Sequence, residues 1–125
     1  MEESNDNIKK TILVAEDVES NFLLLKALLG KTYNLLHAYN GSEAVEMFDN
    51  NQPDLILMDV KMPVMDGLEA TRIIRQKSTE IPIIALTAFA FEQDRIRVME
   101  AGCNDFLTKQ LSPPLLKETI IKYLK

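Results

Sequence analysis

The sequence predicts an α/β fold in which five parallel strands form one sheet with helices on both faces. Three observations support this fold. Short apolar runs alternate with longer amphipathic stretches, several of the runs are apolar at every position, and turn or capping residues separate the segments. Such alternation is typical of right-handed βαβ units, which make neighbouring strands parallel. The 125 residues hold five of these units in one domain.

The five strands are expected at the apolar runs. These runs are residues 11–15, 34–38, 55–58, 81–86 and 105–108. Pro82 fits the start of the fourth run, where a missing N–H is tolerated. Residues 1–10 are polar and without periodicity, so we expect a disordered leader or the remnant of a linker there. The folded domain is therefore expected over residues 11–125.

The first two helices are marked by an apolar stripe and by capping residues. The first helix carries Phe22, Leu25 and Leu29 on one face, and it is expected to end at Gly30. Ser42 is expected to cap the second helix, because its side chain can accept a backbone N–H.

The last three helices have their clearest signals at their ends. Asp66, with Glu69 three residues later, resembles a capping box and predicts the start of the third helix. The fourth helix is expected to end at Gly102, and the AFAFEQDR segment at its start lacks a strong N-cap. Ser112 is the expected cap of the fifth helix, with Pro113 in its first turn.

Composition excludes several classes of function. A net charge of −5 argues against a nucleic-acid partner. One cysteine and one histidine exclude an internal disulfide and a two-histidine zinc site. We expect Cys103 to be buried and His37 to be structural and away from the site. No apolar run reaches about 18 residues, so we expect no direct membrane contact and a cytoplasmic location.

Polar side chains stand where the predicted strands end. Glu16 and Asp17 follow the first strand, Asp59 the third, Thr87 the fourth and Lys109 the fifth. Because the carboxyl ends of parallel strands share one edge of the sheet, these side chains are expected to converge there.

The charges at this edge indicate the chemistry. Two carboxylates about 4 Å apart repel each other by roughly 4 kcal/mol at an effective dielectric constant near 20. Three carboxylates and one ammonium need a further charge of +2, which a divalent cation supplies. Oxygen ligands favour Mg²⁺, or Mn²⁺ as a similar hard ion. Mg²⁺ combines one or two carboxylates with phosphate oxygens, so the expected guest is a phosphoryl group.

Four stretches resemble the receiver domain of two-component response regulators. They are ILVAEDVESN, DLILMDVKMPVMDGLEATRIIR, IPIIALTA and AGCNDFLTK, and the resemblance covers residues 11 to 125. It implies a flavodoxin-like, doubly wound (βα)5 fold with strand order 2-1-3-4-5. The second and third stretches are most similar to receivers at the C-terminal end of hybrid sensor histidine kinases. We therefore expect an excised hybrid-kinase receiver, with a stand-alone regulator as the alternative.

The resemblance also implies how the acidic residues act. Asp59 would accept a phosphoryl group from a phosphohistidine on a sensor histidine kinase or a histidine phosphotransfer domain. Asp17 would bind the metal directly and Glu16 through metal-bound water. The carboxylate of Asp59 and the backbone carbonyl of Lys61 would complete the protein ligands.

The remaining roles concern the phosphoryl group and the response to it. Lys109 would pair with the phosphoryl oxygens and Thr87 would donate a hydrogen bond to them, while the small Ala88 leaves room for the group. Phe106 matches the aromatic switch position. We expect residues 87–92 and Phe106 to change conformation on phosphorylation.

Two positions depart from the family pattern. Gln110 follows Lys109 where most members have proline. A cis bond before a non-proline residue costs about 2.5–4 kcal/mol, so a trans bond is expected. Phe89 and Phe91 place two aromatic residues after Thr87, where they either shield the phosphate, form a docking face or pack into the core.

Two other functions remain alternatives. A Mg²⁺-dependent phosphohydrolase with an aspartyl-phosphate intermediate commonly needs a second acid two residues after the nucleophile, where Lys61 stands. An inert receiver-like binding module would not need a complete charged site. We expect a domain that promotes its own phosphorylation and dephosphorylation without being a stand-alone enzyme, and we leave a weak dimer open. A hybrid parent chain would be a histidine kinase, membrane-anchored or not.

Overall fold

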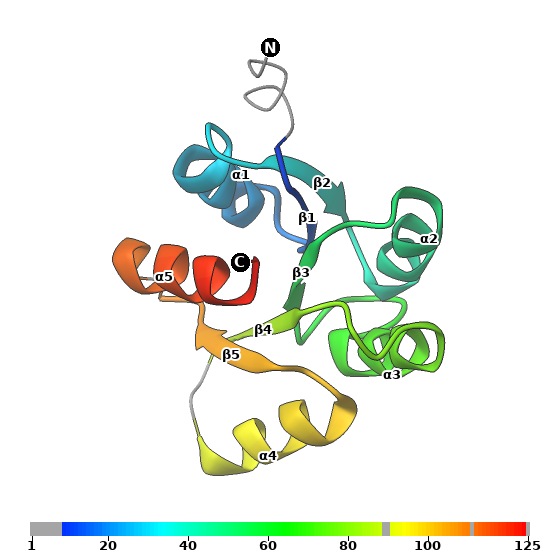
Figure 1. Ribbon diagram of the computed structural model, residues 1–125. Helices are drawn as coiled ribbons and strands as arrows, with labels where there is room; N and C mark the ends of the chain where they lie inside the picture. The colour runs from blue at the N-terminus through cyan, green and yellow to red at the C-terminus, as the bar shows by residue number, and fades with distance from the viewer. Residues whose placement is uncertain (1–8, 89–90, 111, 125) are drawn as a thin grey trace.

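Strands and helices alternate along the chain as predicted. The computed structural model describes residues 9–88, 91–110 and 112–124. The strands are β1 (Thr11–Ala15), β2 (Asn34–Ala38), β3 (Leu55–Asp59), β4 (Ile83–Thr87) and β5 (Asp105–Thr108). The helices are α1 (Glu19–Leu29), α2 (Gly41–Asn51), α3 (Gly67–Lys77), α4 (Glu92–Ala101) and α5 (Pro113–Leu124). The strands pair in parallel in the order β2-β1-β3-β4-β5, which confirms the predicted topology (Figure 1).

The sheet separates two apolar cores. Helices α1 and α5 cover one face and α2, α3 and α4 cover the other (Figure 1). Alternate residues of β1 enter different cores: Ile12 and Val14 pack toward α1 and α5, whereas Leu13 and Ala15 pack toward the opposite face. The central strand β3 is buried at every position. Burial on both faces explains why its sequence is continuously apolar until Asp59.

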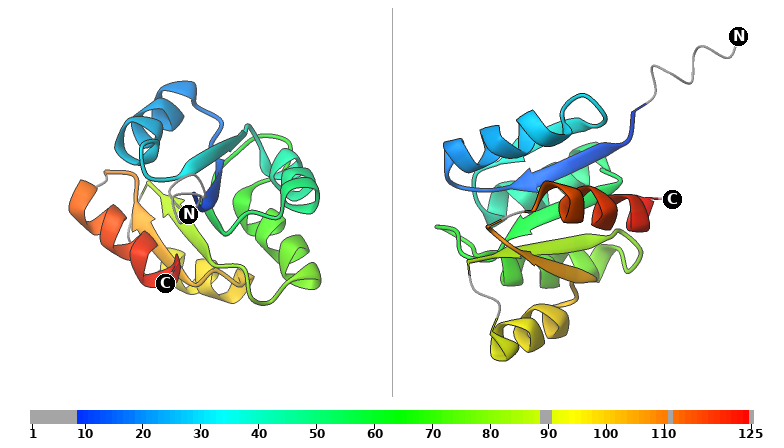
Figure 2. Two further views of the ribbon diagram at one scale, coloured as in Figure 1. Left: turned by 45° about the horizontal axis from the view of Figure 1, so that its top comes forward. Right: turned by 90° about the vertical axis from the view of Figure 1, so that its left-hand side faces the viewer.

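Three strand boundaries differ from the sequence prediction. Strand β3 continues through Asp59, which the prediction left outside the strand. Strand β4 begins at Ile83 rather than at residue 81, and it ends at Thr87 rather than at residue 86. Pro82 has no N–H to donate to a sheet, and its carbonyl instead accepts the Ile56 N–H at 2.9 Å, immediately before the strand begins. All strands run in the same direction, so their carboxyl ends reach one edge (Figure 2).

The predicted cap of α2 was wrong. Asn40, not Ser42, precedes the helix, and its Oδ1 accepts the Glu43 N–H at 2.8 Å. The reason is a contact that is distant in sequence: the Gly41 N–H donates to the Met65 carbonyl at 2.8 Å. A Cβ atom at Gly41 would collide with that carbonyl oxygen, so glycine is needed at the first turn.

The other helix ends agree with the prediction. Helix α1 ends before Gly30, and Asp66 caps α3 by accepting the Glu69 N–H at 2.8 Å. Helix α4 ends at Gly102, whose φ of 115° is left-handed. At its other end Phe91 offers no side-chain cap. Across the part of the chain that the structure describes, the helices lack the length and hydrophobicity needed to cross a membrane.

Candidate functional site

The predicted site residues meet at the carboxyl edge of the sheet. Asp59 and Thr87 are the last residues of β3 and β4, Glu16 directly follows β1, and Lys109 directly follows β5. Glu16, Asp17 and Asp59 bring carboxylate oxygens within 4.8 Å of one another. Charged residues from three separate segments of the sequence thus form one cluster, and Thr87 from a fourth segment lies at the same edge of the sheet.

Backbone hydrogen bonds continue the sheet beyond its last strand residues and fix this cluster. The Glu16 N–H donates to the Ala38 carbonyl at 2.9 Å, and the Lys109 N–H donates to the Thr87 carbonyl at 2.7 Å. The acidic pair and the lysine are therefore attached to rigid strand ends rather than to freely moving loops.

The carboxylate of Asp59 is buried, with 1% of the residue exposed, and it forms an ion pair. Lys109 Nζ donates to Asp59 Oδ2 at 2.8 Å and lies 3.5 Å from Glu16 Oε1. The Lys61 N–H donates to Asp59 Oδ1 at 3.3 Å. Both oxygens of Asp59 consequently have protein donors, and Lys109 lies between two buried acids.

The pKa values of this ion pair reflect burial and mutual interaction. Burial, with the negative charge of Glu16, raises the pKa of Asp59 to about 7, although Lys109 opposes that rise. For Lys109, burial acts to lower the pKa, but its hydrogen bond and charge interactions with Asp59 and Glu16 outweigh burial and raise it. The site therefore carries more negative charge than Lys109 can balance.

The donor set fits a hard divalent cation. Glu16 and Asp59 are each 1% exposed, so their carboxylates have little water to screen their repulsion. With Asp17 they present oxygen atoms close enough to share one ion. The amide of Lys61 faces Asp59, which places the backbone of the fourth predicted ligand beside this cluster.

A cavity of about 220 Å³ opens beside Asp59. Its walls include the predicted residues Lys61, Thr87, Ala88 and Lys109. A larger, more open depression of about 490 Å³ lies at the other end of the sheet, and none of the predicted site residues lines it. The charged cluster, rather than cavity size, identifies the smaller cavity as the functional one.

The segment after β3 is held tightly over the site. The Gly67 N–H donates to the Val60 carbonyl at 2.8 Å, and a Cβ atom at Gly67 would collide with the Asp59 carbonyl oxygen. The Met65 N–H closes a three-residue turn with Pro63, and the central residue of this turn, the exposed Val64, has a φ of 70°. A left-handed β-branched residue indicates a strained turn.

The prediction that His37 lies away from the site was wrong. Its Nε2 lies 2.8 Å from the Glu16 carbonyl oxygen, and its ring stacks on Phe22 with centroids 3.8 Å apart. Tyr39 packs on the same ring at 4.0 Å. Strand β2 pairs with β1, so a side chain near the end of β2 can reach the acidic loop. The parallel pairing was the signal that could have revealed this contact.

Sequence reasoning also missed two charged residues of α4. Asp94 and Arg97 line the 220 Å³ cavity together with the predicted residues. Their spacing of three residues places them on one face of the helix. The rotation of α4 that turns this face toward the cavity could not be read from the sequence.

Phe106, the expected switch residue, and the two positions that depart from the family pattern lie close to the site in the sequence. Phe106 is half-buried and packs against the core beneath α2, α3 and α4, and its switching role stays a prediction. Phe91 is 61% exposed, whereas Phe89 lies outside the described residues. The Lys109–Gln110 peptide bond is trans, like all peptide bonds in the described ranges. Cys103 is buried as predicted.

Known proteins share both this sequence pattern and this fold. The family model for the response regulator receiver domain matches residues 12–121. The polar-differentiation response regulator DivK of Brucella anthropi is 37% identical over 118 residues, covering 92% of this chain and 96% of DivK.

Two solved structures are similar along almost the whole chain. The receiver domain of the sensor histidine kinase PA1611 from Pseudomonas aeruginosa PAO1, with a magnesium ion coordinated in its active site cleft, is 35% identical. Its TM-score is 0.87, covering 94% of this chain and 98% of that one. The Saccharomyces cerevisiae Ssk1 receiver, co-crystallised with the histidine phosphotransfer protein Ypd1, is 31% identical with a TM-score of 0.87, covering 93% and 89%. The chain therefore belongs to the response regulator receiver domain family of two-component signalling.

Proposed function

We propose that Asp59 accepts a phosphoryl group from a phosphohistidine on a partner protein. One observation carries this assignment: the buried carboxylate at the end of β3 is paired with Lys109 at 2.8 Å and borders two further acids. Catalysis of phosphoryl transfer depends mainly on positioning and charge neutralisation, and this cluster offers both.

The transfer needs few protein groups. A carboxylate oxygen of Asp59 forms a bond to phosphorus while the P–N bond to the donor imidazole breaks. The electron pair of that bond stays on the imidazole nitrogen. Lys109 already contacts Asp59, so we assign it to the phosphoryl oxygens, and Thr87 lines the cavity that receives them.

The acidic cluster would hold Mg²⁺, or Mn²⁺, through Glu16, Asp17, Asp59 and the Lys61 carbonyl. This ion would neutralise the charge that gathers on the phosphoryl oxygens. The magnesium ion in the similar PA1611 receiver supports this proposal, as does the fit of the oxygen donors.

We also propose the setting in which the site works. The donor would be a sensor histidine kinase or a histidine phosphotransfer domain, the latter supported by the similarity to the Ssk1 receiver that binds Ypd1. The similarity to the receiver domain of the sensor histidine kinase PA1611 supports a hybrid-kinase parent, whereas DivK, matched over 96% of its length, supports a stand-alone regulator. In either case we place the domain in the cytoplasm. Sequencing the native gene decides between them, and sedimentation velocity tests the weak dimer.

The alternative functions are not favoured. The 220 Å³ cavity has Lys61, not an acid, two residues after Asp59, so a phosphohydrolase would lack its usual proton donor. An inert module would not need the buried cluster of like charges, which is costly without a ligand.

Mass spectrometry of the intact protein tests the proposal. Incubation with Mg²⁺ and acetyl phosphate should add one phosphoryl group, and EDTA or the variant Asp59→Asn should prevent this. The variant Asp49→Asn is the matched control, because Asp49 pairs with Lys77 outside the site. Absence of phosphoryl transfer to the wild type from both acetyl phosphate and a phosphorylated histidine donor would refute the proposal.

A further inference from the structure

Helix α4 brings an exposed arginine to the cavity beside Asp59. Arg97 and Asp94 both line this cavity. Arg97 Nη1 lies 3.7 Å from Asp94 Oδ1, and the Arg97 side chain is 62% exposed. This separation is too long for a hydrogen bond, so the guanidinium is held loosely and can take a stronger partner.

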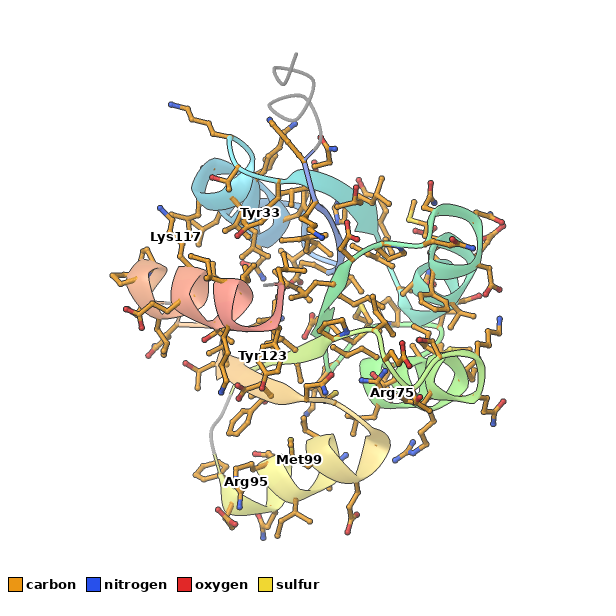
Figure 3. The ribbon with its side chains drawn as sticks, viewed as in Figure 1. Tyr33, Arg75, Arg95, Met99, Lys117 and Tyr123 are labelled. Atoms are coloured by element: carbon orange, nitrogen blue, oxygen red, sulfur yellow. The ribbon has the colours of Figure 1, made fainter. Side chains whose placement is uncertain are left out.

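The neighbouring Arg95 provides a contrast on the same helix. It pairs with Glu92 at 2.9 Å and does not line the cavity. Figure 3 shows Arg95 at the start of α4. The two arginines lie on the same helix and are both largely exposed, but only Arg97 lines the cavity, and it has the longer ion-pair distance.

Phosphorylation changes the charge balance of the cavity. An aspartyl phosphate carries about −2 where the carboxylate carried −1. Lys109 already contacts both Asp59 and Glu16, so much of its charge is matched before the phosphoryl group arrives. The added oxygens project into a space whose other cationic walls are Lys61 and Arg97. A guanidinium can bind two phosphoryl oxygens at once, which an ammonium cannot do with the same geometry.

We propose that Arg97 leaves Asp94 and binds the phosphoryl group on Asp59, so that α4 is directly linked to the phosphorylation state. The proposal rests on the proposed function of Asp59. Helix α4 is suited to this response because its first residue lacks a side-chain cap and its buried residues are Val98 and Ala101. A new contact at Arg97 therefore acts on a weakly anchored helix.

The test compares Arg97→Gln with Arg95→Gln. Each protein is titrated with beryllofluoride, a phosphoryl analogue, in the presence of Mg²⁺, and binding is followed by calorimetry. We expect Arg97→Gln to weaken binding roughly three- to tenfold, as for loss of a charge-assisted hydrogen bond at a partly exposed site. Arg95→Gln should bind as the wild type does. Equal affinities for both variants would overturn the proposal.

Two further measurements separate a direct contact from a general charge effect. In the wild type, the Nε–H resonance of Arg97 should shift on adding beryllofluoride, whereas that of Arg95 should not. Asp94→Asn should strengthen binding, and this gain should disappear in the Arg97→Gln background. If Asp94→Asn strengthens beryllofluoride binding equally in the Arg97→Gln background, Asp94 acts only by repelling the anion. That result would contradict the release of Arg97 from Asp94.

Failure of this inference is distinguishable from failure of the proposed function. If wild-type protein is phosphorylated on Asp59 and Arg97→Gln binds beryllofluoride normally, only the proposed role of Arg97 is refuted. If Asp59 is not phosphorylated, the proposed function and the proposed role of Arg97 are both refuted. Arg97→Lys adds a control on geometry: it keeps the charge, but it should recover only part of the lost affinity.

Discussion

Replacing Asp59 with asparagine should stabilise the metal-free domain at alkaline pH. Burial and Glu16 raise the pKa of Asp59 to about 7 from 3.8. Between these values the folded state binds a proton that the unfolded state has lost, so the free energy of unfolding falls as pH rises from about 4 to 7. At 1.36 kcal/mol per pKa unit, the difference corresponds to on the order of 4 kcal/mol. Because the hydrogen bond and charge of Lys109 oppose the rise and are lost in the variant, we expect about 2–4 kcal/mol.

Urea unfolding in EDTA, followed by circular dichroism, measures this effect. Asp59→Asn should be more stable than the wild type at pH 8, and the difference should shrink toward pH 4, with unchanged denaturant slopes. The control Asp49→Asn, in an exposed ion pair, should change stability by less than about 1 kcal/mol at either pH. A destabilised Asp59→Asn at pH 8, or a gain that is the same at both pH values, would refute the electrostatic reasoning.

Metal addition and three substitutions test other parts of the site and its frame. Millimolar Mg²⁺ should raise the wild-type melting temperature at pH 8, and chelation should reverse this; no change would contradict the metal site. His37→Phe keeps an aromatic ring but loses the contact with the Glu16 carbonyl, so calorimetry should show about tenfold weaker Mg²⁺ binding. Gly67→Ala should cost about 2 kcal/mol or more and slow phosphorylation of Asp59, because the new Cβ meets a backbone carbonyl. Arg75→Met removes the side-chain donor of three carbonyls and one of two donors to the Asn104 Oδ1, and urea unfolding should show a loss of about 2–4 kcal/mol.

The fold and the acidic cluster were predictable because they depend on short-range patterns and one rule of sheet geometry. Apolar runs located the strands to within two residues. The placement of Glu16, Asp59 and Lys109 directly after apolar runs was sufficient to bring them together, since parallel strands end at a common edge.

The missed features depend on contacts between segments far apart in sequence. Asn40 rather than Ser42 caps α2 because Gly41 is bound to the loop after β3. Arg97 reaches the site because the burial of Val98 and Ala101 fixes the rotation of α4 on the core. Neither feature produces a periodic pattern in its own segment of the sequence. Both could therefore be recognised only in the folded structure.

The sheet that separates the two cores has a consequence for signalling. Side chains beneath α4 belong to one core and those beneath α1 and α5 to the other. A rearrangement of α4 can be absorbed on its own side of the molecule, while the layer across the sheet keeps its packing. The domain can thus present an unaltered surface to one protein while it shows a changed surface to another. Asp59, the proposed site of phosphorylation, lies at the edge of the sheet that separates these two layers.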